Sequence, residues 1–119
     1  MSVSTHVLDA ARGRPARGVP VRWESRAPGS GNWEFTAASV TDADGRVGAG
    51  NWLTPGGPEL DPGAGDHRLI FDTGAWFAAQ GLAAFYPEVI VTFTVADAGV
   101  HVHVPLLLSP FSYTTYRGS

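Results

Sequence analysis

Residues 88–95 alternate between two kinds of side chain, and this period of two is typical of an extended β-strand. One face carries three valines and Phe93, and the other carries Ile90 and two threonines. Six further short runs are rich in apolar and β-branched residues: 4–9, 19–24, 33–41, 67–72, 100–108 and 112–116. The chain therefore reads as a series of short strands.

Turn signals separate these runs, with Ala-Asp-Gly at 43–45, Pro-Gly-Gly at 55–57 and Asp-Pro-Gly at 61–63. Residues 48–65 form the one long irregular stretch. Only residues 73–80 favour a helix, which Asp72 or Thr73 would cap and Gly81 would end. The length of 119 residues suits one domain, 1–119. We predict a single, mostly β sandwich or barrel with one short helix.

Charge and composition exclude several classes of function. The net charge is −3 and all eight basic residues are arginine, which argues against nucleic acid as a partner. No cysteine is present, so disulfides and thiolate chemistry are excluded. No apolar run is long enough to span a membrane, and the first residues lack a signal leader. We therefore expect a soluble, cytoplasmic protein, and the low share of charged residues hints that partner subunits cover some of its surface.

Polar groups stand out at His6, Arg46, His103, Arg117 and Ser119. His6 follows the alternation of its strand, with its side chain opposite to those of its neighbours; it is either a hydrogen-bonded edge residue or a general base. Arg46 follows an Asp-Gly turn, where an arginine is usually solvated. Together, imidazoles, guanidinium groups and a hydroxyl suit a planar, anionic, carbonyl-rich substrate, because arginine holds charge and histidine moves protons.

His101 and His103 are two residues apart and so share one face of their strand. Such a pair can bind a metal ion. No cysteine and no carboxylate at ligand spacing accompanies it, and His67 is too isolated in sequence to assign as a third ligand, so the metal site is the lesser interpretation.

Four motifs, in order along the chain, resemble the 5-hydroxyisourate hydrolase family, the transthyretin-like proteins of urate breakdown. They are STHVLDAARGRPARGVPV at 4–21, TDADGR at 41–46, FDTGAWF at 71–77 and HVHVPLLLSPFSYTTYRGS at 101–119. The final YRGS is the most discriminating, because it resembles the tetrapeptide that marks the hydrolases and that the hormone-carrying transthyretins lack.

The resemblance implies a transthyretin-like β-sandwich of two four-stranded sheets with one short helix. It also implies a homotetramer, a dimer of dimers, with active sites in a channel between the dimers. No cofactor and no metal ion are implied. Where the family commonly has tyrosine between the two histidines, this chain has Val102, which we expect to point away from the His103 face and to alter packing.

Site residues follow from the same resemblance. The catalytic groups carry over to His6, Arg46 and His103, with Ser119 of the tail as the fourth. Substrate binding is assigned to His6 and Arg46 together with the tail residues Tyr116, Arg117, Gly118 and Ser119. The implied reaction is the hydrolysis of 5-hydroxyisourate to 2-oxo-4-hydroxy-4-carboxy-5-ureidoimidazoline.

As a mechanistic hypothesis, the histidines deprotonate a water, Arg46 stabilises developing negative charge, and Ser119 with its carboxylate orients the substrate or a histidine. Which histidine takes the proton is left open. Two alternatives from other classes are a transthyretin-like carrier of a small aromatic ligand and a purely structural β-sandwich module.

Overall fold

A computed structural model of the protein describes residues 1–55 and 61–119. Its elements, in chain order, are β1 (Ser2–Asp9), β2 (Arg14–Pro15), β3 (Pro20–Arg26), β4 (Glu34–Val40), β5 (Arg46–Val47), β6 (Gly65–Phe71), α1 (Thr73–Ala78), β7 (Val89–Val95), β8 (His101–Leu108) and β9 (Tyr113–Thr115). Among the described residues, no helix combines the length and the apolar character needed to cross a bilayer.

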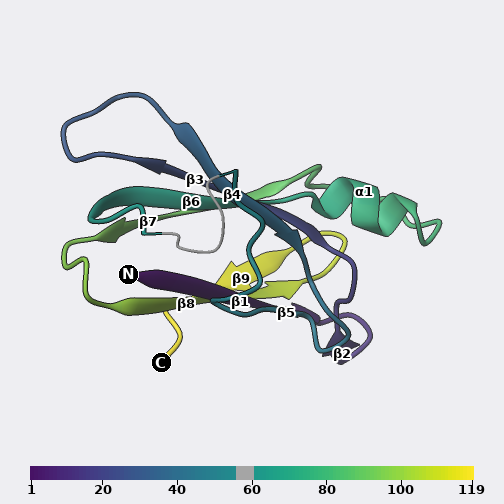
Figure 1. Ribbon diagram of the computed structural model, residues 1–119. Coiled ribbons are helices and arrows are strands. Elements are labelled where there is room, and N and C mark those ends of the chain that lie inside the picture. Colours follow the sequence, from purple (N-terminus) through teal and green to yellow (C-terminus); the bar gives the residue numbers. More distant parts are fainter. Residues whose placement is uncertain (56–60) are drawn as a thin grey trace.

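The strands form two sheets that stack face to face, with α1 at one end (Figure 1). The first sheet has the order β2-β1-β8-β9, and β5 also pairs with β1. The second has the order β4-β3-β6-β7. Strands β1 and β8 run parallel along their whole length, whereas β1 and β5 are antiparallel. As a result, segments from the start, the middle and the end of the chain meet on one sheet.

The predicted mostly β fold with two sheets and one short helix is confirmed. The first sheet has five strands instead of the expected four. Two of the five, β2 and β5, are only two residues long. Two residues are too few to give an alternating pattern in sequence.

The helix begins at Thr73, as predicted, but is regular only to Ala78. Asp72 occupies the N-cap position without a side-chain capping hydrogen bond, and the Thr73 hydroxyl donates instead to the carbonyl of Tyr86 at 3.2 Å. Beyond the helix, the amide of Gly81 donates to the carbonyl of Ala78, so the chain leaves through a tighter last turn.

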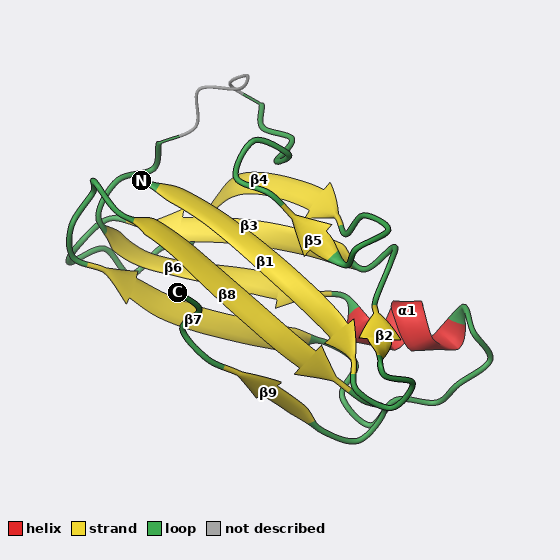
Figure 2. Ribbon diagram, turned by 90° about the horizontal axis from the view of Figure 1, so that it is seen from below, coloured by secondary structure: helices red, strands yellow, loops and turns green. Residues whose placement is uncertain are grey.

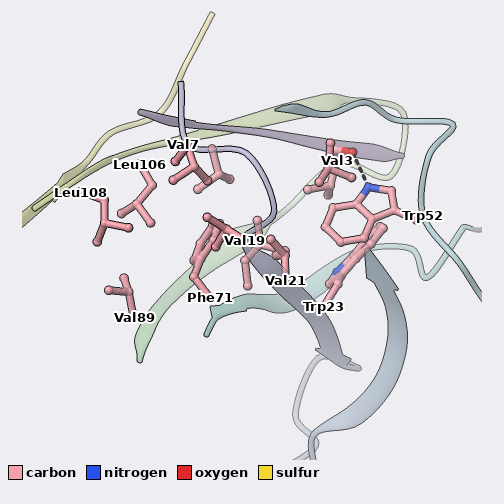
Figure 3. Packing of buried hydrophobic residues seen from close by; sticks show 14 of the residues in the cluster. Val3, Val7, Val19, Val21, Trp23, Trp52, Phe71, Val89, Leu106 and Leu108 are labelled. Atoms are coloured by element: carbon pink, nitrogen blue, oxygen red, sulfur yellow. Dashed lines mark hydrogen bonds between the residues drawn. The ribbon is translucent and has the colours of Figure 1, made fainter. Parts of the chain in front are cut away.

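The core lies between the sheets, where inward-facing side chains of both layers interdigitate (Figure 3). Its largest fully buried members include Trp23, Phe71 and Phe77. Each such side chain contributes about 1.5–3 kcal/mol of hydrophobic stabilisation. The sandwich is therefore a rigid support for groups on its outer faces.

The irregular stretch 48–65 supplies a core residue that sequence alone did not explain. Trp52 is buried and packs edge-on against Trp23, with ring centroids 5.4 Å apart. Its indole nitrogen donates to the carbonyl of Val3 at 2.9 Å (Figure 3), which ties this stretch to β1. The turn expected at 55–57 lies mostly outside the described residues.

Candidate functional site

The side chains of strand β1 alternate between the core and the outer face of the sheet. Val3, Thr5 and Val7 are buried in the core, while Ser4 and His6 lie on the outer face and are half-buried. This is the alternation that the sequence predicted for His6. The outer face of the first sheet is therefore polar at its N-terminal strand.

Arg46 lies directly opposite His6, because β5 pairs antiparallel with β1 in that register. Asp42 stabilises the preceding turn. Its carboxylate accepts hydrogen bonds from the backbone amides of Asp44 and Arg46, at 2.9 Å each. Gly45 has a φ of 76°, and a Cβ there would lie 2.3 Å from the carbonyl oxygen of Val7. A glycine is thus required where the turn docks on β1, and docking places the Arg46 side chain next to His6.

Strand β8 brings His103 beside Ser4, since these two residues are register partners in the parallel pair. The Ser4 hydroxyl lies 2.7 Å from Nδ1 of the ring. Val102 is buried, which confirms that it points away from the His103 face. With Nδ1 engaged by Ser4, Nε2 is the ring nitrogen available to a substrate.

The C-terminal tail returns to β8, and the C-terminus lies close to that strand (Figure 2). Ser119 lines the same hollow as Ser4 and His103. Gly118 forms an isolated bridge with His103, and its amide donates to the carbonyl of His103 at 2.9 Å. A Cβ on Gly118 would lie 2.5 Å from Cδ2 of the imidazole. The absence of a side chain at 118 is therefore what allows the tail to approach the ring.

These segments enclose a hollow of about 410 Å³ on the outer face of the first sheet. Its lining residues are Ser4, Thr5, Arg46, Val47, Gly48, Ala49, His101, His103 and Ser119. Three of the predicted catalytic residues thus share one hollow. The fourth, His6, lies next to it as the register partner of Arg46.

The remaining tail residues lie elsewhere. Tyr116 and Arg117 line a neighbouring groove formed by β7, β8 and the tail, which His103 also borders. Within this chain they do not line the hollow that contains Arg46 and Ser119. Their predicted part in substrate binding stays a prediction.

Electrostatics keep His103 neutral near pH 7. Burial lowers the pKa of its imidazole, and the charges of Arg46, His6 and His101 lower it further. The hydrogen bond from the Arg46 amide, with a smaller contribution from the Arg46 charge, holds the pKa of the Asp42 carboxyl below its usual value. An uncharged imidazole beside a guanidinium group is the arrangement that a general base needs next to an anion site.

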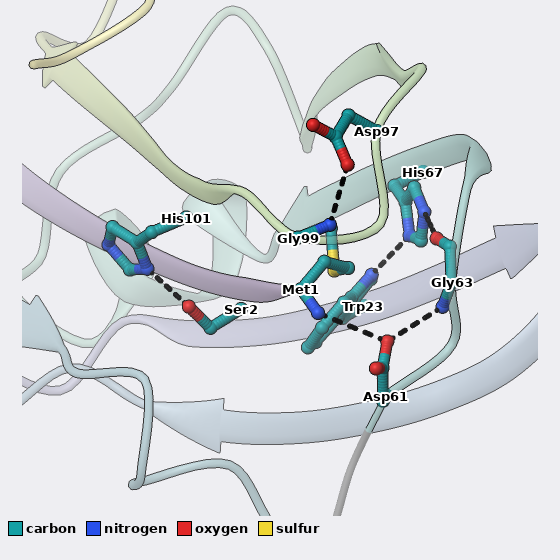
Figure 4. Close-up of polar contacts among 9 residues, drawn as sticks. All are labelled: Met1, Ser2, Trp23, Asp61, Gly63, His67, Asp97, Gly99 and His101. Carbon is teal, nitrogen blue, oxygen red and sulfur yellow. Dashed lines mark hydrogen bonds and ion pairs between the residues drawn. The ribbon is translucent and has the colours of Figure 1, made fainter.

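His67 takes no part in this site. It is buried in the second sheet, where the indole of Trp23 donates to its Nδ1 at 3.1 Å and its Nε2 lies 3.0 Å from the carbonyl of Gly63 (Figure 4). Within residues 1–55 and 61–119, no three His, Cys, Asp or Glu side chains are grouped as metal ligands would be.

Sequence reasoning missed Ser4, which contacts His103 directly. The alternation along β1 was sufficient to put Ser4 on the face of His6. Its contact with His103 depends on the parallel pairing of β1 with β8, across 99 residues, and no local pattern encodes that pairing.

The fold and the site together define a transthyretin-like β-sandwich with a polar, histidine- and arginine-lined hollow on one sheet. Residues 3–118 match the HIUase/Transthyretin family. The chain belongs to that family.

Two relatives by sequence carry the same activity in their names. The chain is 42% identical to a 5-hydroxyisourate hydrolase of Salmonella typhimurium, with 98% of this chain and 80% of the relative covered. It is 43% identical to the mouse 5-hydroxyisourate hydrolase, with 98% and 94% covered.

Solved structures of similar fold include a hydrolase and a transthyretin with bound thyroxine. Klebsiella pneumoniae 5-hydroxyisourate hydrolase matches with a TM-score of 0.81 and 34% identity over 100% of both chains. Sea bream transthyretin in complex with thyroxine matches with a TM-score of 0.84 and 34% identity over 99% of this chain and 95% of that one. Fold similarity alone therefore does not separate an enzyme from a carrier.

Proposed function

We propose that this protein hydrolyses 5-hydroxyisourate to 2-oxo-4-hydroxy-4-carboxy-5-ureidoimidazoline in urate breakdown. The observation that supports this most is the meeting of Arg46, His103 and Ser119, from three distant segments, in one hollow. The names of the sequence relatives point to the same substrate. The reaction opens a ring at an amide-like carbonyl by adding water.

His103 is the general base of this mechanism. It lines the hollow, and its lowered pKa keeps the imidazole neutral and able to accept a proton from water. Water attacks the carbonyl while Nε2 removes its proton. A positioned base of this kind contributes roughly 10²–10⁴-fold to the rate.

Arg46 stabilises the negative charge that develops on the attacked carbonyl or the ring. Its guanidinium takes part in no ion pair within the part of the chain that the structure describes, so it is available to an anionic substrate. His6 lies directly opposite Arg46. In this mechanism its imidazole helps to position the substrate by hydrogen bonding. Ser119 orients the substrate through its hydroxyl group.

The alternative of a ligand carrier rests on the similarity to a thyroxine-binding transthyretin. A carrier of a small aromatic ligand needs an apolar channel, but it does not need a neutral imidazole next to an unpaired guanidinium. The side chains that line the hollow therefore favour a hydrolase over a ligand carrier.

We also propose the homotetramer, a dimer of dimers, with the hollow facing the channel between the dimers. Two features support this assembly. The hollow is open on the outer face of one sheet, and strand β9, at the edge of that sheet, is exposed and carries Tyr113. An exposed edge strand presents unpaired backbone N–H and C=O groups with which a second chain can pair.

The ultraviolet decay of 5-hydroxyisourate, generated in place from urate, tests the activity. Wild-type protein is expected to accelerate the decay, and His103→Asn to reduce kcat by about 10²-fold or more, since the base is lost. Ser30→Ala, on an exposed loop, is the control and should match the wild type. Thyroxine binding without any acceleration of the decay would favour the carrier.

A further inference from the structure

A continuous chain of hydrogen bonds crosses the outer face of the first sheet, and the roles proposed above leave most of it unused. The Ser2 hydroxyl lies 2.5 Å from Nδ1 of His101 (Figure 4). Nε2 of that ring lies 2.9 Å from the Ser4 hydroxyl, and the same hydroxyl lies 2.7 Å from Nδ1 of His103. Two serines and two imidazoles thus alternate along one line.

The backbone dictates this line. In the parallel pair of β1 and β8, Ser2 is the partner of His101 and Ser4 the partner of His103. Alternate residues of a strand share a face, so all four side chains project to the same side. His101 is exposed and His103 is half-buried, so the line runs from solvent to the hollow.

Counting hydrogen atoms shows that the four groups are coupled. A hydroxyl has one hydrogen to donate, and a neutral imidazole has one N–H and one acceptor nitrogen. Ser4 lies between two ring nitrogens and can donate to only one of them, so at least one of these two nitrogens must carry a hydrogen. The tautomer of His103 is therefore tied to the tautomer of His101.

We propose that Ser4 and His101 are positioning residues that set the tautomer of His103 and pass the proton taken by its Nε2 out to solvent. This proposal rests on the hydrolase function proposed above.

The proton transfer balances at every atom. At the start, Nδ1–H of His103 donates to Ser4, the Ser4 hydroxyl donates to Nε2 of His101, and Nδ1–H of His101 donates to Ser2. When Nε2 of His103 takes a proton from the attacking water, each of these hydrogens moves one place along the chain. Ser2 releases its own hydrogen to bulk water. One proton leaves, and no group in the chain changes its charge.

The reverse shift serves the second half of the reaction. When Nε2 of His103 gives its proton to the leaving ring nitrogen, the chain returns a proton to Nδ1 from solvent. The imidazole therefore never has to hold a positive charge. This matters because burial, followed by the charge of Arg46, disfavours an imidazolium at His103.

Ser4→Ala and His101→Gln break the chain in different ways, and Ser4→Thr is the conservative variant that keeps it. Ser4→Ala removes the link, and Ser4→Thr keeps a hydroxyl at the same place. His101→Gln keeps a donor and an acceptor but carries no proton from one end to the other. Ser30→Ala is again the control.

We expect Ser4→Ala to lower kcat by roughly 10-fold or more, within the 10²–10⁴-fold contribution of the base, with KM little changed. His101→Gln should lower kcat by less, and Ser4→Thr should restore most of the loss. A merely structural role would not affect the proton inventory, which is the rate measured in mixtures of H₂O and D₂O. We expect it to be curved for the wild type, since several protons move, and linear for Ser4→Ala.

The outcomes separate this proposal from the function on which it rests. An active wild type, with Ser4→Ala and His101→Gln at the wild-type kcat and an unchanged inventory, overturns the relay and leaves the hydrolase intact. A wild type that does not accelerate the decay overturns the function and the catalytic use of the relay together. Nitrogen-15 shifts of the two imidazoles show whether Ser4 couples them, and uncoupled titration in the wild type also overturns the relay.

Discussion

Two close neighbours, Ser4 and Gly118, hold the imidazole of His103 in place. Ser4 holds its Nδ1, and the backbone of Gly118 lies against its Cδ2. Neither contact involves the core. Changes at the residue scale can therefore alter the chemistry of the site while the fold stays intact.

Gly118→Ala tests this separation. The new Cβ would lie 2.5 Å from Cδ2 of His103, so either the ring or the tail must move. Displacement by about 1 Å can cost on the order of 10²-fold in rate. We expect a large loss of kcat in the decay assay and a wild-type melting temperature. Wild-type kcat would show that the close approach of the tail is not needed.

The buried His67 makes the free energy of unfolding depend on pH. Burial lowers the pKa of its imidazole below the usual 6.5, so the unfolded chain binds a proton more readily than the folded one. Stability is therefore full above about pH 6.5 and falls as the pH drops toward the folded-state pKa. Protonation also places a second N–H against the indole N–H of Trp23.

His67→Gln isolates this contribution, because glutamine can accept from Trp23 and donate to Gly63 but does not titrate. We expect the melting temperature of the wild type to fall more steeply from pH 7 to pH 5 than that of the variant. Parallel curves for the two proteins would contradict the assignment.

At the scale of elements, the turn before β5 positions Arg46 through Gly45. Gly45→Ala forces an alanine into a φ of 76° and sets its Cβ 2.3 Å from the Val7 carbonyl oxygen. We expect a loss of about 2 kcal/mol or more in the free energy of unfolding by urea, together with lower activity.

Gly13→Ala is the matched control, because its φ is 68° but a Cβ there meets nothing within 4 Å. Gly13→Ala should lower the free energy of unfolding only by the cost of a left-handed backbone conformation, about 1–2 kcal/mol. Equal losses in the two variants would show that the docking of the turn on β1 adds nothing.

Alternation in the sequence was sufficient to predict the long strands, such as β7 and β8. The start of α1 was predicted correctly, but the expected side-chain cap is absent, because Asp72 makes no capping hydrogen bond. Alternation was not sufficient for β5, because two residues show no period and Arg46 reads locally as part of a turn. The faces of His6 and Val102 followed from the period of two. The neighbours of His103 did not, since Ser4 and Gly118 reach it through parallel pairing and a returning tail. For the site, family motifs supplied what local patterns lacked.

At the level of the whole molecule, the proposed homotetramer predicts the mass of the protein in solution. If the hollow faces a channel between dimers, the protein in solution has four times the 12.5 kDa mass of the chain, about 50 kDa. Light scattering after gel filtration measures this mass. A fully active monomer would show that one chain supplies the entire site.

A comparison of the intact protein with a variant truncated before Tyr116 tests the proposed hydrolase and its use of the tail. Both are assayed for the ultraviolet decay of 5-hydroxyisourate. We expect the intact protein to accelerate the decay and the truncated protein not to. The truncated protein should keep the melting behaviour of the wild type, since the tail lies outside the core. Equal acceleration by both proteins, or none by the intact protein, would contradict a hydrolase built from β1, β5, β8 and the tail.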